Sequence, residues 1–165
     1  MRMKLVVPLG VALLGLVGCS QAAAPGVLAG EPWVRTTDGK QKPEMTAVFV
    51  NLTNPTSKEV KLTAADCGDV AQKTELHIME KKDGQMMMTQ TEAIAVPAEG
   101  HEHLAPGGPH IMLMGLNRQL PVGSEEVKCQ LTFDNGQKLD IVAPVKEFTE
   151  EQETYHTHEG EGHSG

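Results

Sequence analysis

Two short segments of the chain combine histidine with methionine at a regular spacing. The first, LHIMEKKDGQMMMTQ, covers residues 76–90 and contains one histidine and four methionines. The second, PGGPHIMLMGL, covers residues 106–116 and again has a methionine two residues after a histidine. Thioether sulfur is a soft, neutral donor that suits Cu(I) and binds hard cations poorly, while imidazole binds either copper state. These residue types therefore indicate a site for a soft metal ion.

Strand geometry would separate these donors from the aliphatic residues beside them. Side chains of a β-strand point alternately to its two faces. The aliphatic residues would then face the core, and the opposite face would carry His77, Met79, Met86, Met88, His110, Met112 and Met114. A methionine cluster on a strand is also typical of packing, or of an adaptable surface for a partner. The pattern by itself leaves metal binding and packing as alternatives.

The elements that must position these residues are predicted to be strands. Apolar and β-branched residues dominate or alternate in four further segments, 46–52, 58–64, 126–133 and 138–145. The sequence DNGQ between the last two is a hairpin turn signal. Alternation predicts one buried face with Val60, Leu62 and Ala64, and another with Val127, Cys129, Leu131 and Phe133. No long amphipathic helix is indicated, so we expect an all-β sandwich or small barrel of roughly seven to nine strands.

The N-terminus has the features of an export signal. A short basic start, MRMK, precedes an apolar run that is shorter than the ~20 residues of a membrane-spanning helix. Residues 16–19, Leu-Val-Gly-Cys, are similar to a bacterial lipobox, in which the cysteine is acylated. We therefore predict a signal peptide at 1–18, a lipid anchor at Cys19, a tether at 19–31, and a location in the bacterial cell envelope. An ordinary signal peptide with a chance cysteine is the alternative.

The charge of the mature chain excludes one class of partner. Removal of residues 1–18 leaves 147 residues with 12 Lys and Arg against 22 Asp and Glu, a formal charge of −10. Nucleic-acid binding requires a basic surface, so we expect no nucleic-acid partner. A positively charged protein partner would be steered toward this chain.

Two cysteines remain after the lipid anchor, Cys67 and Cys129. In an exported protein an even pair is expected to form a disulfide. Two buried free thiols are the alternative.

The donor spacing resembles that of a known family, the periplasmic PCu(A)C copper chaperones for the CuA centre of cytochrome c oxidase. Their motif is a histidine, ten residues, a methionine, twenty-one residues and then His-x-Met. Here His77, Met88, His110 and Met112 match this spacing without a gap. The segments PWVR (32–35), FVNLTN (49–54) and LAPGGPHIMLMGL (104–116) are also similar, and the resemblance covers residues 31–145.

The resemblance implies a cupredoxin-like Greek-key β-sandwich or barrel at residues 32–146, with Cu(I) held by His77, Met88, His110 and Met112. It also implies delivery of copper to cytochrome c oxidase subunit II, directly or through a thiol-bearing Sco-type partner. Met79 and Met86 would lie on the same strand face as the motif residues but are outside the motif itself, so we treat them as auxiliary donors. Met114 is expected to serve packing.

Two further groups of histidines lie outside the motif. His101 and His103 in GHEHLAP would share one face of a short strand, as a second, harder copper site or simply as exposed residues. The tail at 147–165 is acidic and poor in aliphatic residues, so we expect it to be disordered. It contains His156, His158 and His163 beside glutamates, a donor set suited to Cu(II) or Zn²⁺. We hypothesise that it captures Cu(II).

Several functions compete with a Cu(I) carrier. An electron-transfer cupredoxin would need a thiolate with two histidines around copper. A metal-dependent enzyme would need an open coordination position and acid or base groups nearby. We expect neither, and no small-molecule substrate. An envelope lipoprotein that sequesters or stores copper, or a metal-free interaction domain using the methionine-rich face, stays as the alternative.

Overall fold

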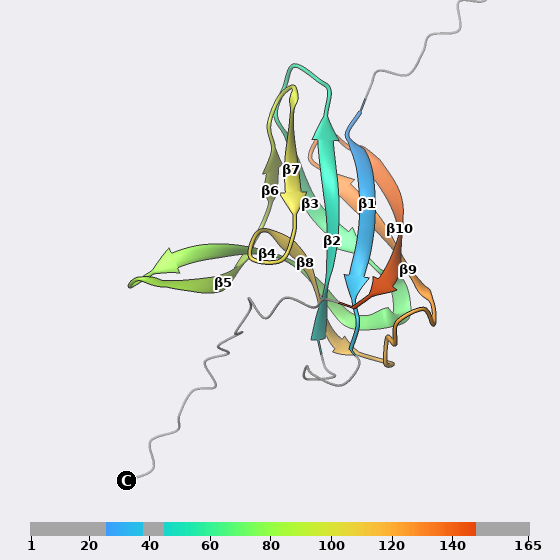
Figure 1. Ribbon diagram of the computed structural model, residues 1–165. Helices are drawn as coiled ribbons and strands as arrows, with labels where there is room; N and C mark the ends of the chain where they lie inside the picture. The colour runs from blue at the N-terminus through green and yellow to red at the C-terminus, as the bar shows by residue number, and fades with distance from the viewer. Residues whose placement is uncertain (1–25, 38–44, 148–165) are drawn as a thin grey trace, which may run out of the picture.

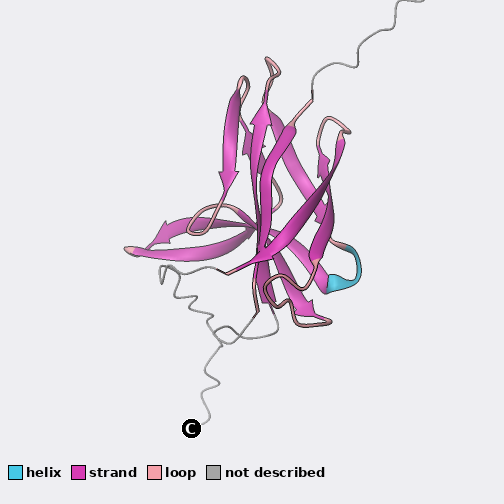
Figure 2. Ribbon diagram, turned by 45° about the vertical axis from the view of Figure 1, so that its right-hand side comes forward, coloured by secondary structure: helices cyan, strands magenta, loops and turns pink. Residues whose placement is uncertain are grey.

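The computed structural model describes residues 26–37 and 45–147. Figure 2 shows that this part is built of strands, with one short 3-10 helix, η1 (Gly68–Val70). The ten strands are β1 (Leu28–Arg35), β2 (Met45–Asn54), β3 (Val60–Asp66), β4 (Ala71–Lys82), β5 (Gln85–Thr91), β6 (Ile94–Val96), β7 (Gly100–Leu104), β8 (His110–Leu116), β9 (Glu126–Phe133) and β10 (Lys138–Lys146). The all-β prediction is confirmed, although the strands outnumber the expectation because β6 and β7 pair as separate short strands.

The strands form two layers that share one parallel connection (Figure 1). The first layer has the order β5-β4-β8-β2-β1, and the second has the order β10-β9-β3-β6. β1 and β10 pair in parallel and join the layers, while β2 pairs with β8 through its first half and with β7 through its second. The β4–β5 hairpin extends from the sandwich as an arm (Figure 1). Among the described residues no helix is long and apolar enough to cross a membrane.

Alternation along the strands builds the core between the layers. In β9 the four residues expected to face the core, Val127, Cys129, Leu131 and Phe133, are all buried. In β3 the expectation holds for Val60 and Leu62 but is wrong for Ala64, which is exposed. The register between β3 and β9 shifts between Leu62 and Ala64. This irregularity reverses the faces of the residues after it, which a strict period of two does not predict.

The first strand begins earlier than expected, because residues 28–31, assigned above to the tether, form the first half of β1. Their sequence, LAGE, does not alternate. Its register against β2 shifts between Gly30 and Trp33, and Glu31 has a φ of 50°. A bulge therefore keeps this segment paired despite its composition. The predicted signal peptide, Cys19, tether residues 20–25 and the tail after Glu147 lie outside the described residues.

Asn54 fastens the end of β2 to the second layer. Its side chain is fully buried. Its amide nitrogen donates to the carbonyl oxygens of Lys58, Val96 and Pro97, at 2.8, 3.1 and 3.0 Å. Its Oδ1 accepts from both the backbone N–H and the hydroxyl of Thr56. All the hydrogen-bonding capacity of the amide is thus used, and the return of the chain into β7 beside β2 is held in place.

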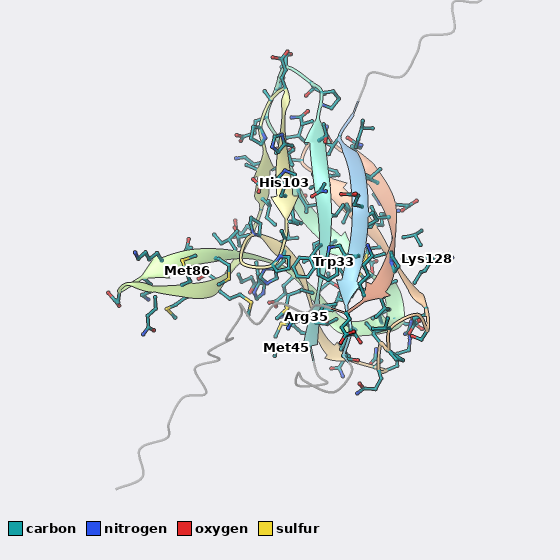
Figure 3. The ribbon with its side chains drawn as sticks, in the orientation of Figure 1. Trp33, Arg35, Met45, Met86, His103 and Lys128 are labelled. Carbon is teal, nitrogen blue, oxygen red and sulfur yellow. A yellow bond between two sulfur atoms is a disulfide. The ribbon has the colours of Figure 1, made fainter. Side chains whose placement is uncertain are left out.

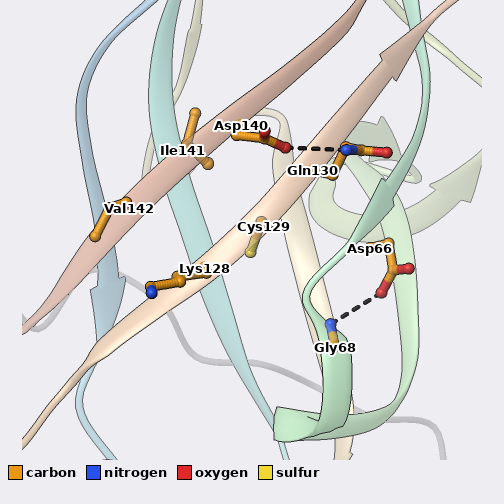
Figure 4. Close-up of a pocket in the computed structure, with 8 residues that line it drawn as sticks. All are labelled: Asp66, Gly68, Lys128, Cys129, Gln130, Asp140, Ile141 and Val142. Carbon is orange, nitrogen blue, oxygen red and sulfur yellow. Dashed lines mark hydrogen bonds between the residues drawn. The ribbon is translucent and has the colours of Figure 1, made fainter.

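The two described cysteines join β9 to the segment before η1. The sulfur atoms of Cys67 and Cys129 lie 2.01 Å apart, a disulfide bond between residues 62 apart in sequence. Cys129 also borders an open hollow of about 430 Å³ on the second layer (Figure 4). There Gln130 donates to Asp140 and the backbone of Gly68 donates to Asp66. No histidine or methionine of the described part of the chain lines this hollow, so it is separate from the predicted donors on β4, β5 and β8.

We predict that the double replacement Cys67→Ser and Cys129→Ser lowers the free energy of unfolding by about 4 kcal/mol. The cross-link closes a loop of 62 residues, which restricts the unfolded chain. Urea denaturation under oxidising conditions measures the difference. A thiol reductant should lower the midpoint of the wild-type protein and leave the double variant unchanged; an insensitive wild-type midpoint would contradict the prediction.

Candidate metal centre

The pairing of β4 with β8 brings the two histidines of the motif together. His77 and His110 are directly opposite each other in this antiparallel pair. Their ring centroids lie 5.7 Å apart, with the ring planes tilted by 39°. The residues are only 7% and 1% exposed. Two imidazoles from distant parts of the sequence therefore meet in a place that is nearly closed to water.

Met88 on β5 lies beside His110. Its sulfur is 3.2 Å from Nε2 of His110. The Nδ1 of His110 lies 2.9 Å from the carbonyl oxygen of Gly108. Because a carbonyl oxygen only accepts, Nδ1 carries the proton in the neutral ring and Nε2 presents its lone pair to the sulfur. Nitrogen and sulfur ligands of one tetrahedral ion lie roughly 3.5 Å apart, at metal–ligand distances of ~2.0 and ~2.3 Å, so this separation fits a shared ion.

Met112 lies in a second apolar cluster, on the side of the first layer that faces away from the main core. This outer cluster is formed by Ala47, Phe49 and Met112, with Trp33, Met45, Met88 and Met114 packed against it. Figure 3 labels Trp33 and Met45. Met112 is opposite Ala47 on β2 and Glu75 on β4, and is 2% exposed. Met88 and Met112 thus face away from the main core, as parity predicts, but Met112 is buried rather than at a surface.

Aromatic residues form one wall of this centre. The rings of Trp33 and Phe49 are 4.5 Å apart, and those of Phe49 and His110 are 6.3 Å apart. Phe49 lies against the imidazole of His110, which is 1% exposed. The spacing of the donors in the sequence does not indicate these aromatic residues. The alternation of Met45, Ala47 and Phe49 along one face of β2 is a signal that could have found two of them.

Glu75 orients His77. The Nε2 of His77 is 2.9 Å from Oε2 of Glu75, whose side chain is 8% exposed and also pairs with Lys73. The hydrogen bond from Lys73, and next that from His77, lower the pKa of Glu75, although burial opposes the shift. An ionised carboxylate only accepts, so Nε2 carries the proton and Nδ1 is left with the lone pair in the neutral ring.

The Nδ1 atom of His77 is left without a role by these hydrogen bonds. It is buried and has no hydrogen-bond partner among the described residues. A buried nitrogen of this kind costs free energy unless something binds it. A carboxylate on the far nitrogen of a metal-binding histidine is also the usual support for such a ligand. The donor spacing does not indicate Glu75, although this residue lies two residues before His77 and therefore on the same strand face.

The auxiliary candidates lie further out. Met79 is opposite Met88 in the β4–β5 arm and is half-buried. Met86 is 56% exposed on the same arm (Figure 3), opposite Lys81. Met114 packs against the outer cluster, as expected. The histidines of the tail, His156, His158 and His163, lie outside the described residues.

The donor set is one that soft ions use. The two imidazoles and the thioether of Met88 meet here, and Met112 lies in the outer cluster against which Met88 packs. Thioethers favour Cu(I) over hard cations. Among residues 26–37 and 45–147, no three His, Cys, Asp or Glu side chains form a group that could hold a metal ion. Any ion bound at this centre would therefore depend on the sulfur donors.

Comparison with known proteins agrees with this architecture. Residues 27–145 match the family model described as "LpqE-like: Putative lipoprotein LpqE-like". The chain is 32% identical over 154 residues to "Putative lipoprotein Lxx21020" of Leifsonia xyli subsp. xyli, covering 87% of this chain and 89% of that protein.

Solved structures are similar as well. The copper-bound PCuAC domain from PmoF2 superposes with a TM-score of 0.60 at 21% identity, over 76% of this chain and 97% of that domain. The solution structure of CuI-DR1885 from Deinococcus radiodurans gives a TM-score of 0.56 at 32% identity, over 78% and 82% of the two chains. The resemblance inferred from the donor spacing is thereby confirmed. The chain belongs to the LpqE-like family, and its sandwich has the fold of the PCuAC domain.

Proposed function

We propose that this protein is a Cu(I)-binding metallochaperone. The observation that carries the proposal is the approach of Nε2 of His110 to the sulfur of Met88, at 3.2 Å, beside the unpartnered Nδ1 of His77. A relative of 32% identity, DR1885, was solved as its CuI form, which supports copper as the cargo. His77, Met88, His110 and Met112 would be the ligands.

The chemistry of these donors suits a carrier. Neutral thioethers and imidazoles bind Cu(I) without the loss of a thiol proton, and they persist where cysteines become oxidised. The outer cluster, which includes Phe49 with Trp33 packed against it, covers the imidazole of His110. Neutral ligands hold the ion less firmly than thiolates would, so a client with thiolates can take it over.

The disulfide argues against an electron-transfer cupredoxin. Such a site needs a cysteine thiolate beside two histidines. Cys67 and Cys129, the cysteines of the described part of the chain, are bonded to each other, and Cys129 lies on β9 in the second layer. Among the described residues, the site offers no carboxylate or hydroxyl arranged as an acid or base beside an open position, since Glu75 is held by His77 and Lys73. We therefore assign no enzymatic activity.

The arm formed by β4 and β5 favours transfer over storage. Met79, Met86 and Met88 share the face of His77, and Met86 reaches solvent. A client could take the ion through these exchangeable sulfurs. We assign export and a lipid anchor at Cys19, in keeping with relatives described as lipoproteins. The client we propose is the CuA site of cytochrome c oxidase, reached directly or through a Sco-type protein.

Replacement of one ligand methionine tests the site. We expect Met88→Leu to weaken Cu(I) binding at least tenfold, because leucine keeps the packing volume but removes the sulfur. Competition with a chromophoric Cu(I) chelator measures the affinity. The matched control is Met87→Leu on the neighbouring position of β5, whose side chain points to the opposite face.

The control separates ligation from packing. Met87→Leu should bind Cu(I) as the wild-type protein does, and both variants should retain the wild-type circular dichroism spectrum. Equal affinities for Met88→Leu and the wild-type protein would refute the assignment of Met88 as a ligand.

A second prediction concerns the support of His77. Glu75→Ala should lower Cu(I) affinity tenfold to a hundredfold, the usual effect of losing a carboxylate behind a ligand histidine. Glu75→Gln keeps an acceptor oxygen and should lose less. Nitrogen NMR of the metal-free protein should find the proton of His77 on Nε2 in the wild type; a proton on Nδ1 would contradict the role given to Glu75.

Transfer kinetics distinguish a carrier from a storage protein. Copper-loaded protein mixed with a copper-free soluble CuA or Sco-type domain should lose Cu(I) at a rate that rises with acceptor concentration. Met86→Leu should slow this transfer and leave the equilibrium affinity nearly unchanged, because Met86 is exposed on the arm. A release rate independent of the acceptor would instead indicate storage.

A further inference from the structure

A second group of possible ligands lies on β7. His101 and His103 are both exposed and share one face of this strand. Their ring centroids are 4.8 Å apart, with the planes tilted by 60°. We propose that this pair is a second metal site, selective for divalent transition ions of borderline softness such as Cu²⁺ or Zn²⁺. Imidazole without thioether is the donor set that suits such ions.

The network behind His103 fixes which nitrogen would bind. Nδ1 of His103 is 2.7 Å from Oδ1 of Asn51, its direct neighbour on β2. The amide nitrogen of Asn51 in turn donates to Oε2 of Glu31, at 3.1 Å. Because the carboxylate accepts from the amide nitrogen, the amide oxygen is directed to the histidine. His103 therefore donates through Nδ1 and turns Nε2, with its lone pair, outward.

The backbone around Glu31 aims its carboxylate at this network. Glu31 has a φ of 50° and lies where the register of β1 against β2 shifts. A non-glycine residue in this region is strained, and such strain persists only where the surrounding contacts hold it. Bulges commonly redirect a side chain next to a functional site. Here the redirected carboxylate orients Asn51 and adds negative charge near the imidazoles.

The pair lies on the same face of β2 as the Cu(I) centre. Asn51 and Thr53, the neighbours of His103 and His101, alternate in step with Ala47 and Phe49 of the outer cluster. The register places His103 beside Asn51 and Met112 beside Ala47, four residues along the strand, or about 13 Å. Figure 3 shows His103 on the upper part of this layer, above Trp33 and Met45. The two sites would be neighbours with different preferences.

Titration of the full mature chain with Zn²⁺ tests the proposal. The tail histidines are first replaced throughout by His156→Gln, His158→Gln and His163→Gln, so that they do not contribute. In this background the protein should bind one equivalent of Zn²⁺ by calorimetry, and the added pair His101→Gln and His103→Gln should abolish it. Glu102→Gln, between the two histidines but on the opposite face, is the matched control and should keep the equivalent.

Two further readouts keep the outcome decisive. Cu²⁺ should broaden the NMR signals of His101, His103 and Asn51 in the background protein. Asn51→Leu should weaken Zn²⁺ binding at least tenfold, and Asn51→Asp should restore it. Cu(I) affinity should be the same with and without the histidine pair, so the result is independent of the proposed chaperone function. Unchanged Zn²⁺ stoichiometry after loss of both histidines would overturn the proposal.

Discussion

The antiparallel pairing of β4 with β8 is the constraint on which the metal centre depends. It sets His77 directly against His110, and every other donor is placed relative to these two. β5 pairs with the outer edge of β4 and brings Met88 to His110. β2 pairs with the other edge of β8, so that Met112 packs in one cluster with Ala47 and Phe49. A register slip of one residue would turn all these side chains to the opposite face. The aliphatic residues of the same strands prevent such a slip, because it would expose Leu76 and Ile111.

The same pleat therefore serves stability and function through its two faces. One face builds the main core, and the other builds the outer cluster that surrounds the donors. The disulfide and Asn54 act on parts remote from the donors, the first in the second layer and the second at the far end of β2. Their effect on the centre is indirect, because they stabilise the packing of the two layers, and β2, β4 and β8 belong to the first layer. These remote interactions stabilise the fold and offset the cost of the buried Nδ1 of His77, which has no hydrogen-bond partner among the described residues.

Much of this arrangement is predictable from the sequence. A period of two correctly separates donors from aliphatic residues, and it finds the buried face of β9. It fails at two irregularities: the shift in β3, which exposes Ala64, and the bulge in β1, which lets LAGE pair as a strand. Both depend on how neighbouring strands meet, which no local pattern contains. The aromatic wall is missed for a similar reason, since Trp33 reaches Phe49 only through the pairing of β1 with β2. Glu75 is a different case, because the sequence itself shows that it lies two residues before His77 and so on the same strand face.

The two imidazoles are supported unequally, and this asymmetry bears on how an ion would leave. His77 donates to a buried carboxylate, whose negative charge strengthens the opposite nitrogen as a ligand, whereas His110 donates to the neutral carbonyl of Gly108. Charge-assisted hydrogen bonds are roughly twice as strong as neutral ones. His77 is therefore the more firmly oriented of the two and the better donor. Among the proposed ligands, Met88 has the most room to exchange, because it lies on the arm beside half-buried Met79 and exposed Met86. Under the proposed function, a client approaching along the arm would replace sulfur ligands first, and His77 would hold the ion until the exchange is complete.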